Sequence, residues 1–327
     1  SVGKQETTES DGPQGISTMY GDSNLNGCAW CSAPILAATF NQELGYKMGA
    51  AVGQEGMAKG ISAWYAPGMD THRSPFSGRN FEYYSEDPIL AGMMATQVVS
   101  GAADNGVSCV IKHLFLNDME TDRNHICTWC NEQAMREIYL RPFELAIKNA
   151  TTTLKYIADD EGTVETKTVR ACNGIMTSMG NIGSTYCGTN YNLCTNVLRN
   201  EMGFRGMIMT DMAENSCNSR DMMLRSGVDE YMYFTAASVS DLKDSTSPTM
   251  LSVTREAVKH MCYMVVNSSA MQGLAPGSSI THAMSPWMMW LIVGDVAAGV
   301  IIVLLAVVTI RRRQDEKRHP EKYAGVK

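Results

Sequence analysis

The chain has 327 residues, of which 44% are hydrophobic, and a formal net charge of -7. That length can bury a sizeable hydrophobic core and excludes a small scaffold held together by disulfides. The acidic balance, with basic residues spread thinly except at Arg311, Arg312 and Arg313, excludes nucleic acid as an expected partner.

Short apolar runs alternate with amphipathic stretches, which favours βα units around a parallel sheet. The expected strands are 61–67, 107–113, 172–178, 206–211 and 228–234. The expected helices are 88–105, 132–149, 191–202 and 250–271. We therefore predict an α/β fold, a (β/α)8 TIM-like barrel over residues 1–272 followed by one transmembrane helix. The chain starts only ten residues before its first motif, so we allow for a barrel that is incomplete at the N-terminus.

Two polar segments stand outside this alternation. Residues 151–168 are rich in Thr, Asp, Glu and Lys and fall between a predicted helix and a predicted strand, so we interpret them as a surface excursion. Gly, Ser, Pro and Thr dominate residues 273–286, which we interpret as a linker.

Residues 287–310 are almost all apolar and long enough to cross a hydrocarbon core roughly 30 Å thick. Trp287 and Trp290 stand at one end and three arginines at the other, which matches the interfacial aromatic belt and the positive-inside rule. We predict a single-pass helix that contacts lipid in the cell membrane, with the barrel outside and a basic cytoplasmic tail at 311–327. A buried helix of a soluble protein is the alternative. Asp295 is costly inside a span, although its position near one end brings it close to the headgroups.

Ten cysteines occur in the chain, and Cys28/Cys31 and Cys127/Cys130 each form a C-x-x-C pair. An oxidising exterior permits disulfides. The two pairs could hold zinc, but they lie about 100 residues apart, far beyond the spacing of a zinc ribbon. We expect small buried thiols with at most one local bridge, and we predict neither a metal nor a cofactor.

Polar residues end several of the predicted strands. The run VSCVIKH ends in Lys112 and His113, and GMIMTDM carries Asp211 where its strand ends. The segment HRSPFSGRNFEYYSEDP follows the strand at 61–67. An acid after a strand often only caps the next helix. Active sites of parallel barrels, however, are built at the carboxyl ends of the strands, so the shared position of these residues favours a functional site.

Seven motifs in this order resemble the barrel domain of the glycoside hydrolase family 3 β-glucosidases, and the resemblance extends from Asp11 to Val266. They are DGPQG, LAATFNQELGYKMGAAVGQE, SPFSGRNFEYYSEDP, IKHLFLNDMETDR, NEQAMREIYLRPFE, IMTSMGNIG and GFRGMIMTDM. The most specific of them is GRNFEYYSEDP.

The resemblance implies retaining hydrolysis through a covalent glycosyl-enzyme intermediate, in which Asp211 matches the nucleophile. It also implies that Asp11 holds hydroxyls of the sugar in the innermost subsite. The positions that match other sugar-contacting residues are Arg79, Lys112, His113 and Arg123. Charged side chains suit this task because they hold sugar hydroxyls by charge-assisted hydrogen bonds. A structural salt bridge is the alternative for Arg79 and Lys112.

Three positions depart from the family pattern. Ser17 stands where the family usually has an arginine, Met179 where it commonly has a tyrosine, and Met212 where an aromatic residue normally follows the nucleophile. Each change removes either a polar contact with the sugar or an aromatic surface on which the sugar ring could stack.

The general acid/base stays unassigned. Family β-glucosidases mostly take it from a second α/β domain that follows the barrel, and other members place that domain first. A start at Ser1 is consistent with loss of an upstream domain, so we expect a missing domain or a partner chain to supply the acid. The β-N-acetylglucosaminidases use a His-Asp dyad in a P-G-H-G loop that this chain lacks, which makes Asp122 and His125 weak candidates. Glu214 is interpreted as an acid in the first turn of a helix.

Three hypotheses remain. The first is a membrane-anchored retaining glycosidase acting on short β-linked glucosides or xylosides. The second is a catalytically impaired, membrane-anchored carbohydrate-binding barrel, which the three departures favour. The third is a tethered scaffold without a sugar function, which the combination of Asp211 with Lys112, His113 and Arg123 disfavours.

Overall fold

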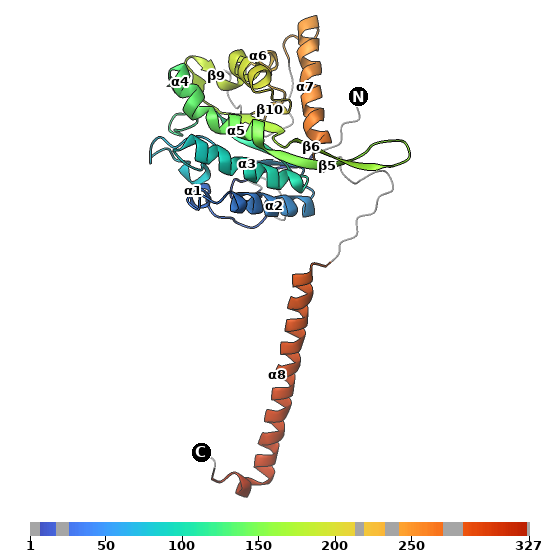
Figure 1. The fold of residues 1–327 in the computed structure, drawn as a ribbon. Helices are drawn as coiled ribbons and strands as arrows, with labels where there is room; N and C mark the ends of the chain where they lie inside the picture. Colours follow the sequence, from blue (N-terminus) through green and yellow to red (C-terminus); the bar gives the residue numbers. More distant parts are fainter. Residues whose placement is uncertain (1–6, 18–25, 213–218, 233–241, 271–283, 326–327) are drawn as a thin grey trace. The chain divides into compact units, whose positions relative to one another are not determined.

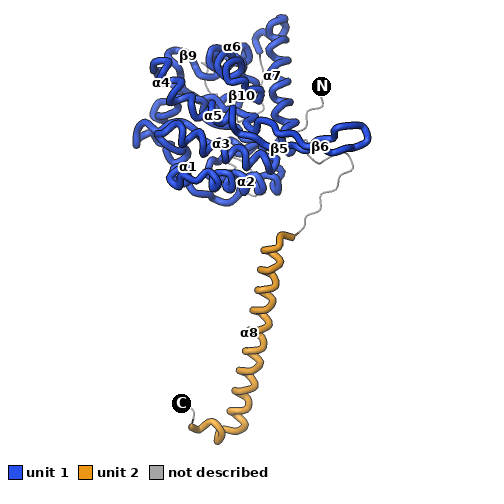
Figure 2. The backbone as a smooth tube through the Cα atoms, in the orientation of Figure 1, with its two compact units in different colours: residues 1–274 blue, residues 275–327 orange. Residues whose placement is uncertain are grey.

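The structure is a computed structural model that describes residues 7–17, 26–212, 219–232, 242–270 and 284–325. The chain divides into two compact units, Ser1–Leu274 and Ala275–Lys327 (Figure 1; Figure 2). The first unit contains the residues predicted to form the barrel, and the second contains the predicted membrane segment.

A parallel sheet runs through the first unit (Figure 1). Its five strands, in spatial order, are β1 (Glu9–Asp11), β2 (Ala63–Tyr65), β3 (Ser108–Leu114), β7 (Gly174–Thr177) and β10 (Met207–Thr210). Every neighbouring pair is parallel, with Asp11 opposite Tyr65 and Met207 opposite Gly174. The α/β fold predicted from the alternation of apolar runs is therefore confirmed, and β2, β3, β7 and β10 overlap predicted strands.

The sheet continues beyond β10 by a single contact. Glu230, within the predicted strand 228–234, forms a parallel bridge with Met209, and residues 233–234 lie outside the described part of the chain. Among the described strands, none pairs β10 or Glu230 back to β1. Closure into an eight-stranded barrel therefore stays a prediction.

Two long helices, α2 (Gln42–Ala58) and α3 (Pro88–Asp104), pack against each other beside the sheet (Figure 1). The side chains of Asn41 and Asp87 cap their N-termini by accepting hydrogen bonds from backbone N–H groups of the first turn. A Cβ at Gly49 of α2 would lie 2.1 Å from a carbonyl oxygen of α3, so the close approach of the two helices requires glycine.

The other helical elements of this unit are α1 (Ala33–Ala37), η2 (Asn80–Glu82), α4 (Glu132–Ala134), η3 (Met135–Tyr139), α5 (Arg141–Asn149), η4 (Cys187–Thr189), η5 (Asn192–Glu201), α6 (Arg220–Ser226) and α7 (Pro248–Val266). All four predicted helices are confirmed. The one predicted at 132–149 is a succession of α4, the π-helical η3 and α5, and the one at 191–202 is π-helical throughout η5.

The polar segment between α5 and β7 is a β-hairpin. Its strands β5 (Thr151–Ile157) and β6 (Val164–Arg170) pair antiparallel, with Leu154 opposite Lys167, and most of their side chains are exposed. The segment is thus a surface excursion, as predicted, and its Thr, Val, Ile and Tyr content explains the extended conformation. A small three-stranded sheet is formed by β4 (Cys127–Thr128), β8 (Asn181–Ile182) and β9 (Thr185–Tyr186).

Apolar side chains are buried on both faces of the central sheet. Trp64, Ile111 and Ile208 belong to a large cluster that includes residues of α2 and α3. Met209, a neighbour of Ile208 on β10, belongs instead to a second cluster with Met264 of α7. Successive side chains of a strand point to opposite faces, so this division is expected for a sheet covered on both sides.

The second unit is dominated by α8 (Pro286–Arg318), followed by the short turn η7 (Pro320–Lys322). The most apolar window of α8 has a mean hydropathy of 2.8, and none of it is buried. Its length and composition suit a membrane span, and the span itself stays a prediction. The helix extends beyond the predicted end at 310 because Arg, Gln, Glu and Lys are good helix formers. Residues 273–283 of the predicted linker lie outside the described residues.

Nine cysteines fall in the described residues, and all nine are free, so neither C-x-x-C pair forms a bridge. The expectation of buried thiols is confirmed for Cys109, Cys172, Cys187 and Cys194. It is wrong for the three exposed ones, Cys28, Cys31 and Cys127, because they lie in a surface loop and on a short strand of the small sheet. Within the described residues, no three His, Cys, Asp or Glu side chains gather as a metal site would require.

Candidate active site

The C-terminal ends of the sheet strands open onto a cavity of about 510 Å³. The ends of β1, β3 and β10 contribute Asp11, Lys112, His113 and Asp211, and the loops after β2 and β3 contribute Arg79 and Arg123. The structure therefore brings together all six residues that the sequence nominated. The rest of the wall is formed by Pro13, Gln14, Tyr65, Phe81, Glu82, Glu120, Met176, Met212 and Met232.

The carboxylate of Asp211 has one oxygen bonded and one free. The backbone N–H of Asp211 donates to the carbonyl of Thr177 at 3.1 Å, and Oδ1 accepts a hydrogen bond from the backbone N–H of Met212 at 2.7 Å. Oδ2 is buried and has no hydrogen-bond partner among the described residues. An unpaired buried oxygen is costly unless something else contacts it. Oδ2 is therefore the oxygen of this carboxylate that no hydrogen bond occupies, in a residue that lines the cavity.

Two nitrogens approach this free oxygen. His113 Nε2 lies 3.7 Å from Asp211 Oδ2, and Arg123 Nη1 lies 3.8 Å from it. Both distances are too long for a hydrogen bond, but the guanidinium charge still acts strongly at this range in a partly buried site. Burial holds the pKa of His113 well below its usual range, and the cations Arg79, Lys112 and Arg123 lower it further. The imidazole is therefore neutral at pH 7.

A hydrogen-bond network fixes His113. Its Nδ1 lies 2.9 Å from the hydroxyl of Tyr83, which also accepts from Asn117 Nδ2, and its Nε2 lies 3.2 Å from Arg79 Nη2. The carboxyl of Asp70 accepts hydrogen bonds from the backbone N–H groups of His113 at 2.8 Å and Asn117 at 2.9 Å. Burial raises the pKa of Asp70 to about 7, although those two N–H groups oppose the rise. Asp70 thus ties the end of β3 to the loop that follows it.

Two glutamates hold the arginines in the wall. Arg79 forms ion pairs with Glu82 and, at 3.5 Å, with Glu120. Arg123 pairs with Glu120 at 3.0 Å. Burial raises the pKa of Glu82, while Lys112 and Arg79 lower it to a smaller extent. The arginines are consequently positioned before any ligand enters, which reduces the ordering cost of binding.

Lys112 and Asp11 form an ion pair between the C-terminal ends of β3 and β1. The Nζ atom of Lys112 donates to Oδ1 of Asp11 at 2.5 Å. The side chain of Lys112 is 3% exposed and that of Asp11 is 31% exposed. A buried lysine without a counter-charge would be costly, so Asp11 has a structural task, while its accessible carboxylate can also accept hydrogen bonds from a ligand. The salt-bridge alternative is therefore confirmed at Lys112. Its role in ligand binding stays a prediction, which its place in the cavity wall supports.

One part of the wall is apolar. Phe81 is half exposed at the rim, and Met176, Met212 and Met232 complete this side. Met212 therefore occupies a position where it can contact a ligand, as expected for the residue after Asp211. Met179 does not belong to the described cavity wall, so the structure gives its departure from the family pattern less weight.

Sequence reasoning missed four residues that support the site, namely Asp70, Glu82, Tyr83 and Glu120. The two glutamates left a signal in the sequence, because each lies three residues from the arginine it pairs with in GRNFE and ETDR. The exposed side chains of Asp122 and His125 form a hydrogen bond of 2.8 Å and do not line the cavity, so their weak candidacy as an acid dyad gains no support. Glu214 lies outside the described residues.

Comparison with known proteins agrees with the family resemblance of the sequence motifs. Residues 15–258 match the family model described as the glycosyl hydrolase family 3 N terminal domain. Beta-glucosidase B of Emericella nidulans is 34% identical over 220 residues, which are 67% of this chain and 23% of that protein. A beta-glucosidase of Ruminococcus albus is 34% identical over 231 residues, covering 68% of this chain and 22% of that protein. The chain thus spans less than a quarter of the length of these relatives.

Solved structures show the same likeness. Beta-glucosidase 3B from Thermotoga neapolitana in complex with alpha-D-glucose aligns with a TM-score of 0.66 and 30% identity, over 81% of this chain and 36% of that chain. A beta-glucosidase from Paenibacillus barengoltzii aligns with a TM-score of 0.69 and 27% identity, over 86% of this chain and 30% of that chain.

Proposed function

We propose that this chain, which belongs to glycosyl hydrolase family 3, carries the nucleophile and the sugar-binding residues of a retaining glycosidase for β-linked glucosides or related short oligosaccharides. The curated relatives named above are beta-glucosidases. One observation carries the proposal: Asp211 lines a cavity walled by charged side chains, and its carboxylate has a buried oxygen, Oδ2, without a hydrogen-bond partner among the described residues.

In the proposed reaction, Asp211 Oδ2 attacks the anomeric carbon as the bond to the leaving-group oxygen breaks. A covalent glycosyl-enzyme forms, and water then hydrolyses it. Positive charge develops on the sugar during each step, and the carboxylate stabilises it. The proposed sugar-binding residues are Asp11, Arg79, Lys112, His113 and Arg123, which can donate or accept hydrogen bonds with ring hydroxyls.

The proposed architecture is a (β/α)8 barrel over residues 1–272. The unbroken parallel order of β1, β2, β3, β7 and β10 supports it, as does the further parallel bridge at Glu230. We propose a linker at 273–286, a transmembrane helix at 287–310 and a basic tail at 311–327. The exposed apolar surface of α8 supports lipid contact in the cell membrane. The arginines after 310 favour a cytoplasmic tail and an external barrel.

We propose that the general acid/base comes from a second domain or a partner chain. Among the described residues, the carboxylates in the cavity wall besides Asp211 are those of Asp11, Glu82 and Glu120. Each forms an ion pair with Lys112 or an arginine, and this pairing holds the carboxylate in place in the cavity wall. A proton donor must reach the leaving-group oxygen in a suitable pose, and none of these three has that freedom.

A carbohydrate-binding barrel without turnover is the second candidate. Met212 in the cavity wall favours it, because a thioether replaces the expected aromatic stacking face. The unpaired Asp211 Oδ2 favours the catalytic proposal, because a binding protein has no need to bury an unsatisfied carboxylate oxygen.

Hydrolysis of 2,4-dinitrophenyl β-glucoside tests the proposal, because this leaving group departs without an acid. The chain is expected to release dinitrophenolate at least about a thousand-fold faster than Asp211→Asn, which keeps the shape of the side chain and removes its charge. Asp122→Asn, in an exposed loop outside the cavity, is the matched control and should retain the rate. Equal rates for the chain and Asp211→Asn, with glucose binding intact in both, would support the binding barrel instead.

A further inference from the structure

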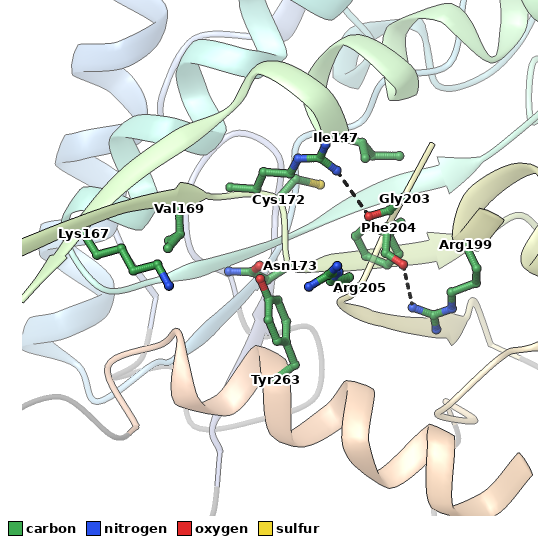
Figure 3. Close-up of a pocket in the computed structure, with 11 residues that line it drawn as sticks. Ile147, Lys167, Val169, Cys172, Asn173, Arg199, Gly203, Phe204, Arg205 and Tyr263 are labelled. Carbon is green, nitrogen blue, oxygen red and sulfur yellow. Dashed lines mark hydrogen bonds between the residues drawn. The ribbon is translucent and has the colours of Figure 1, made fainter. Parts of the chain in front are cut away.

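A second cavity, of about 530 Å³, is lined by residues next to the N-terminal ends of β7 and β10 (Figure 3). In its wall, Asn173 directly precedes β7 and Arg205 lies just before β10, whereas Asp211 follows β10. Because β7 and β10 are parallel, their N-terminal ends face away from the candidate active site. Strand β6 of the hairpin and α7 also line the cavity, together with α5, η5 and the loop before β10. The wall therefore includes part of the excursion that the proposed function leaves unexplained.

Positive charge gathers in this cavity. Lys167, Arg170, Arg199 and Arg205 line it, and none of its described lining residues is Asp or Glu. Arg199 is neutralised by Asp229 at 2.5 Å. Arg170 donates only to backbone carbonyls of the loop before β10, so its charge has no carboxylate partner among the described residues.

Lys167 and Arg205 extend from different sides toward Asn173 and Tyr263 in Figure 3. Neither cation forms a salt bridge within the residues that the structure describes. The nearest acid on the same face of β6 is Glu165, two residues from Lys167, and its carboxylate accepts a hydrogen bond from the hydroxyl of Tyr156. The two cations are therefore directed into the cavity without a counter-charge.

Asn173 supplies an independent sign of a ligand. Its side chain is 1% exposed, and its Oδ1 has no hydrogen-bond partner among the described residues. An unsatisfied buried amide is costly and calls for an explanation. Rotation of the amide exchanges its oxygen and nitrogen, so the same group can present an N–H donor to the cavity.

We propose that this cavity binds the phosphate group of a small phosphorylated molecule. Lys167 and Arg205 supply the charge, and the Asn173 amide and the Tyr263 hydroxyl supply neutral donors. A phosphate fits this set because its oxygens accept several charge-assisted hydrogen bonds at once, and arginine matches its geometry. The cavity is larger than one phosphate, so the ligand carries an organic part, either a soluble ester or a lipid headgroup.

Calorimetric titration of the full chain in nonionic detergent with inorganic phosphate tests the proposal, with chloride at equal ionic strength as the blank. Saturable binding is expected, and the double variant K167M/R205M should weaken it at least about ten-fold. Lys155→Met is the matched control, because Lys155 lies on the same hairpin, is exposed and does not line the cavity. It should change the affinity less than about two-fold.

Two further measurements make the result decisive. Circular dichroism of the double variant, compared with Lys155→Met, establishes that its fold is retained. Glycerol 3-phosphate and short-chain phosphatidic acid added to the micelles distinguish the sources: tighter binding of the lipid identifies a headgroup, and tighter binding of the ester identifies a soluble ligand. Binding that survives in the folded double variant would overturn the proposal. So would a folded wild-type chain that binds none of the three probes.

Discussion

Asp70→Asn is expected to alter the free energy of unfolding by an amount that depends on pH. Burial raises the pKa of Asp70 from 3.8 to about 7. The folded protein therefore retains a proton that the unfolded chain loses as the pH rises from 3.8 to 7, and the contribution of Asp70 to stability falls across that window. A pKa raised by about three units corresponds to about 4 kcal/mol, at roughly 1.4 kcal/mol per unit. The difference in unfolding free energy, wild type minus Asp70→Asn, should fall by that amount between pH 4 and 7.

His113→Gln should show the opposite dependence. Burial and the neighbouring cations hold the pKa of His113 well below 6.5, so below that pH the unfolded chain binds a proton that the folded protein does not. The contribution of His113 is therefore fully present above pH 6.5 and is lost as the pH falls, at about 1.4 kcal/mol per pH unit. Between pH 4 and 6.5 the contributions of Asp70 and His113 to the unfolding free energy change in opposite directions with pH. Each single variant removes one contribution and leaves the pH dependence of the other.

Urea denaturation at pH steps from 4 to 8 measures both effects, with tryptophan fluorescence as the probe because Trp64 is fully buried. The difference relative to wild type removes the contribution of carboxylates elsewhere in the chain. A difference for Asp70→Asn that is constant over this range would mean that Asp70 does not titrate there. A difference that grows with rising pH would mean that Asp70 is folded in its ionised form, and either result would refute the argument from burial.

Three further predictions concern the proposed reaction. Lys112→Met removes a charged donor from the cavity and should weaken glucose binding at least about ten-fold in a calorimetric titration; unchanged affinity would remove Lys112 from the sugar site. Met212→Trp adds a stacking face worth about 1 kcal/mol and should tighten glucose binding about five-fold, whereas weaker binding would show that this wall does not accept a ring. Sodium azide should accelerate turnover of dinitrophenyl β-glucoside and yield β-glucosyl azide, detected by chromatography, because no base is assigned to activate water. Rapid turnover without the azide product would indicate an acid/base within this chain.

The positions of the reacting groups could be predicted from the sequence because strand ends leave a clear pattern. Asp211 and the Lys112–His113 pair each terminate an apolar run, and parallel strands place their carboxyl ends together. The family resemblance added Asp11, the last residue of the three-residue strand β1, and also Arg79 and Arg123, whose loops carry no periodic signal. All six line one cavity.

The supporting network could not be predicted in the same way. Asp70 and Glu120 act through loops whose conformation is set by tertiary hydrogen bonds, and loop residues carry no hydrophobic period to indicate which backbone group they meet. The hairpin 151–170 was also missed as a strand pair, because its side chains are mostly polar and alternate without an apolar face. Its many β-branched residues were the available signal.

The most direct test of the account is covalent labelling of Asp211. The full chain is incubated with 2,4-dinitrophenyl 2-deoxy-2-fluoro-β-glucoside, which slows release of the glycosyl-enzyme, and its peptides are examined by mass spectrometry. The account predicts one fluoroglucosyl adduct, on the peptide that contains Asp211, and its absence from Asp211→Asn. A folded chain that binds glucose and acquires no adduct on Asp211 would contradict the central claim that this carboxylate is the nucleophile.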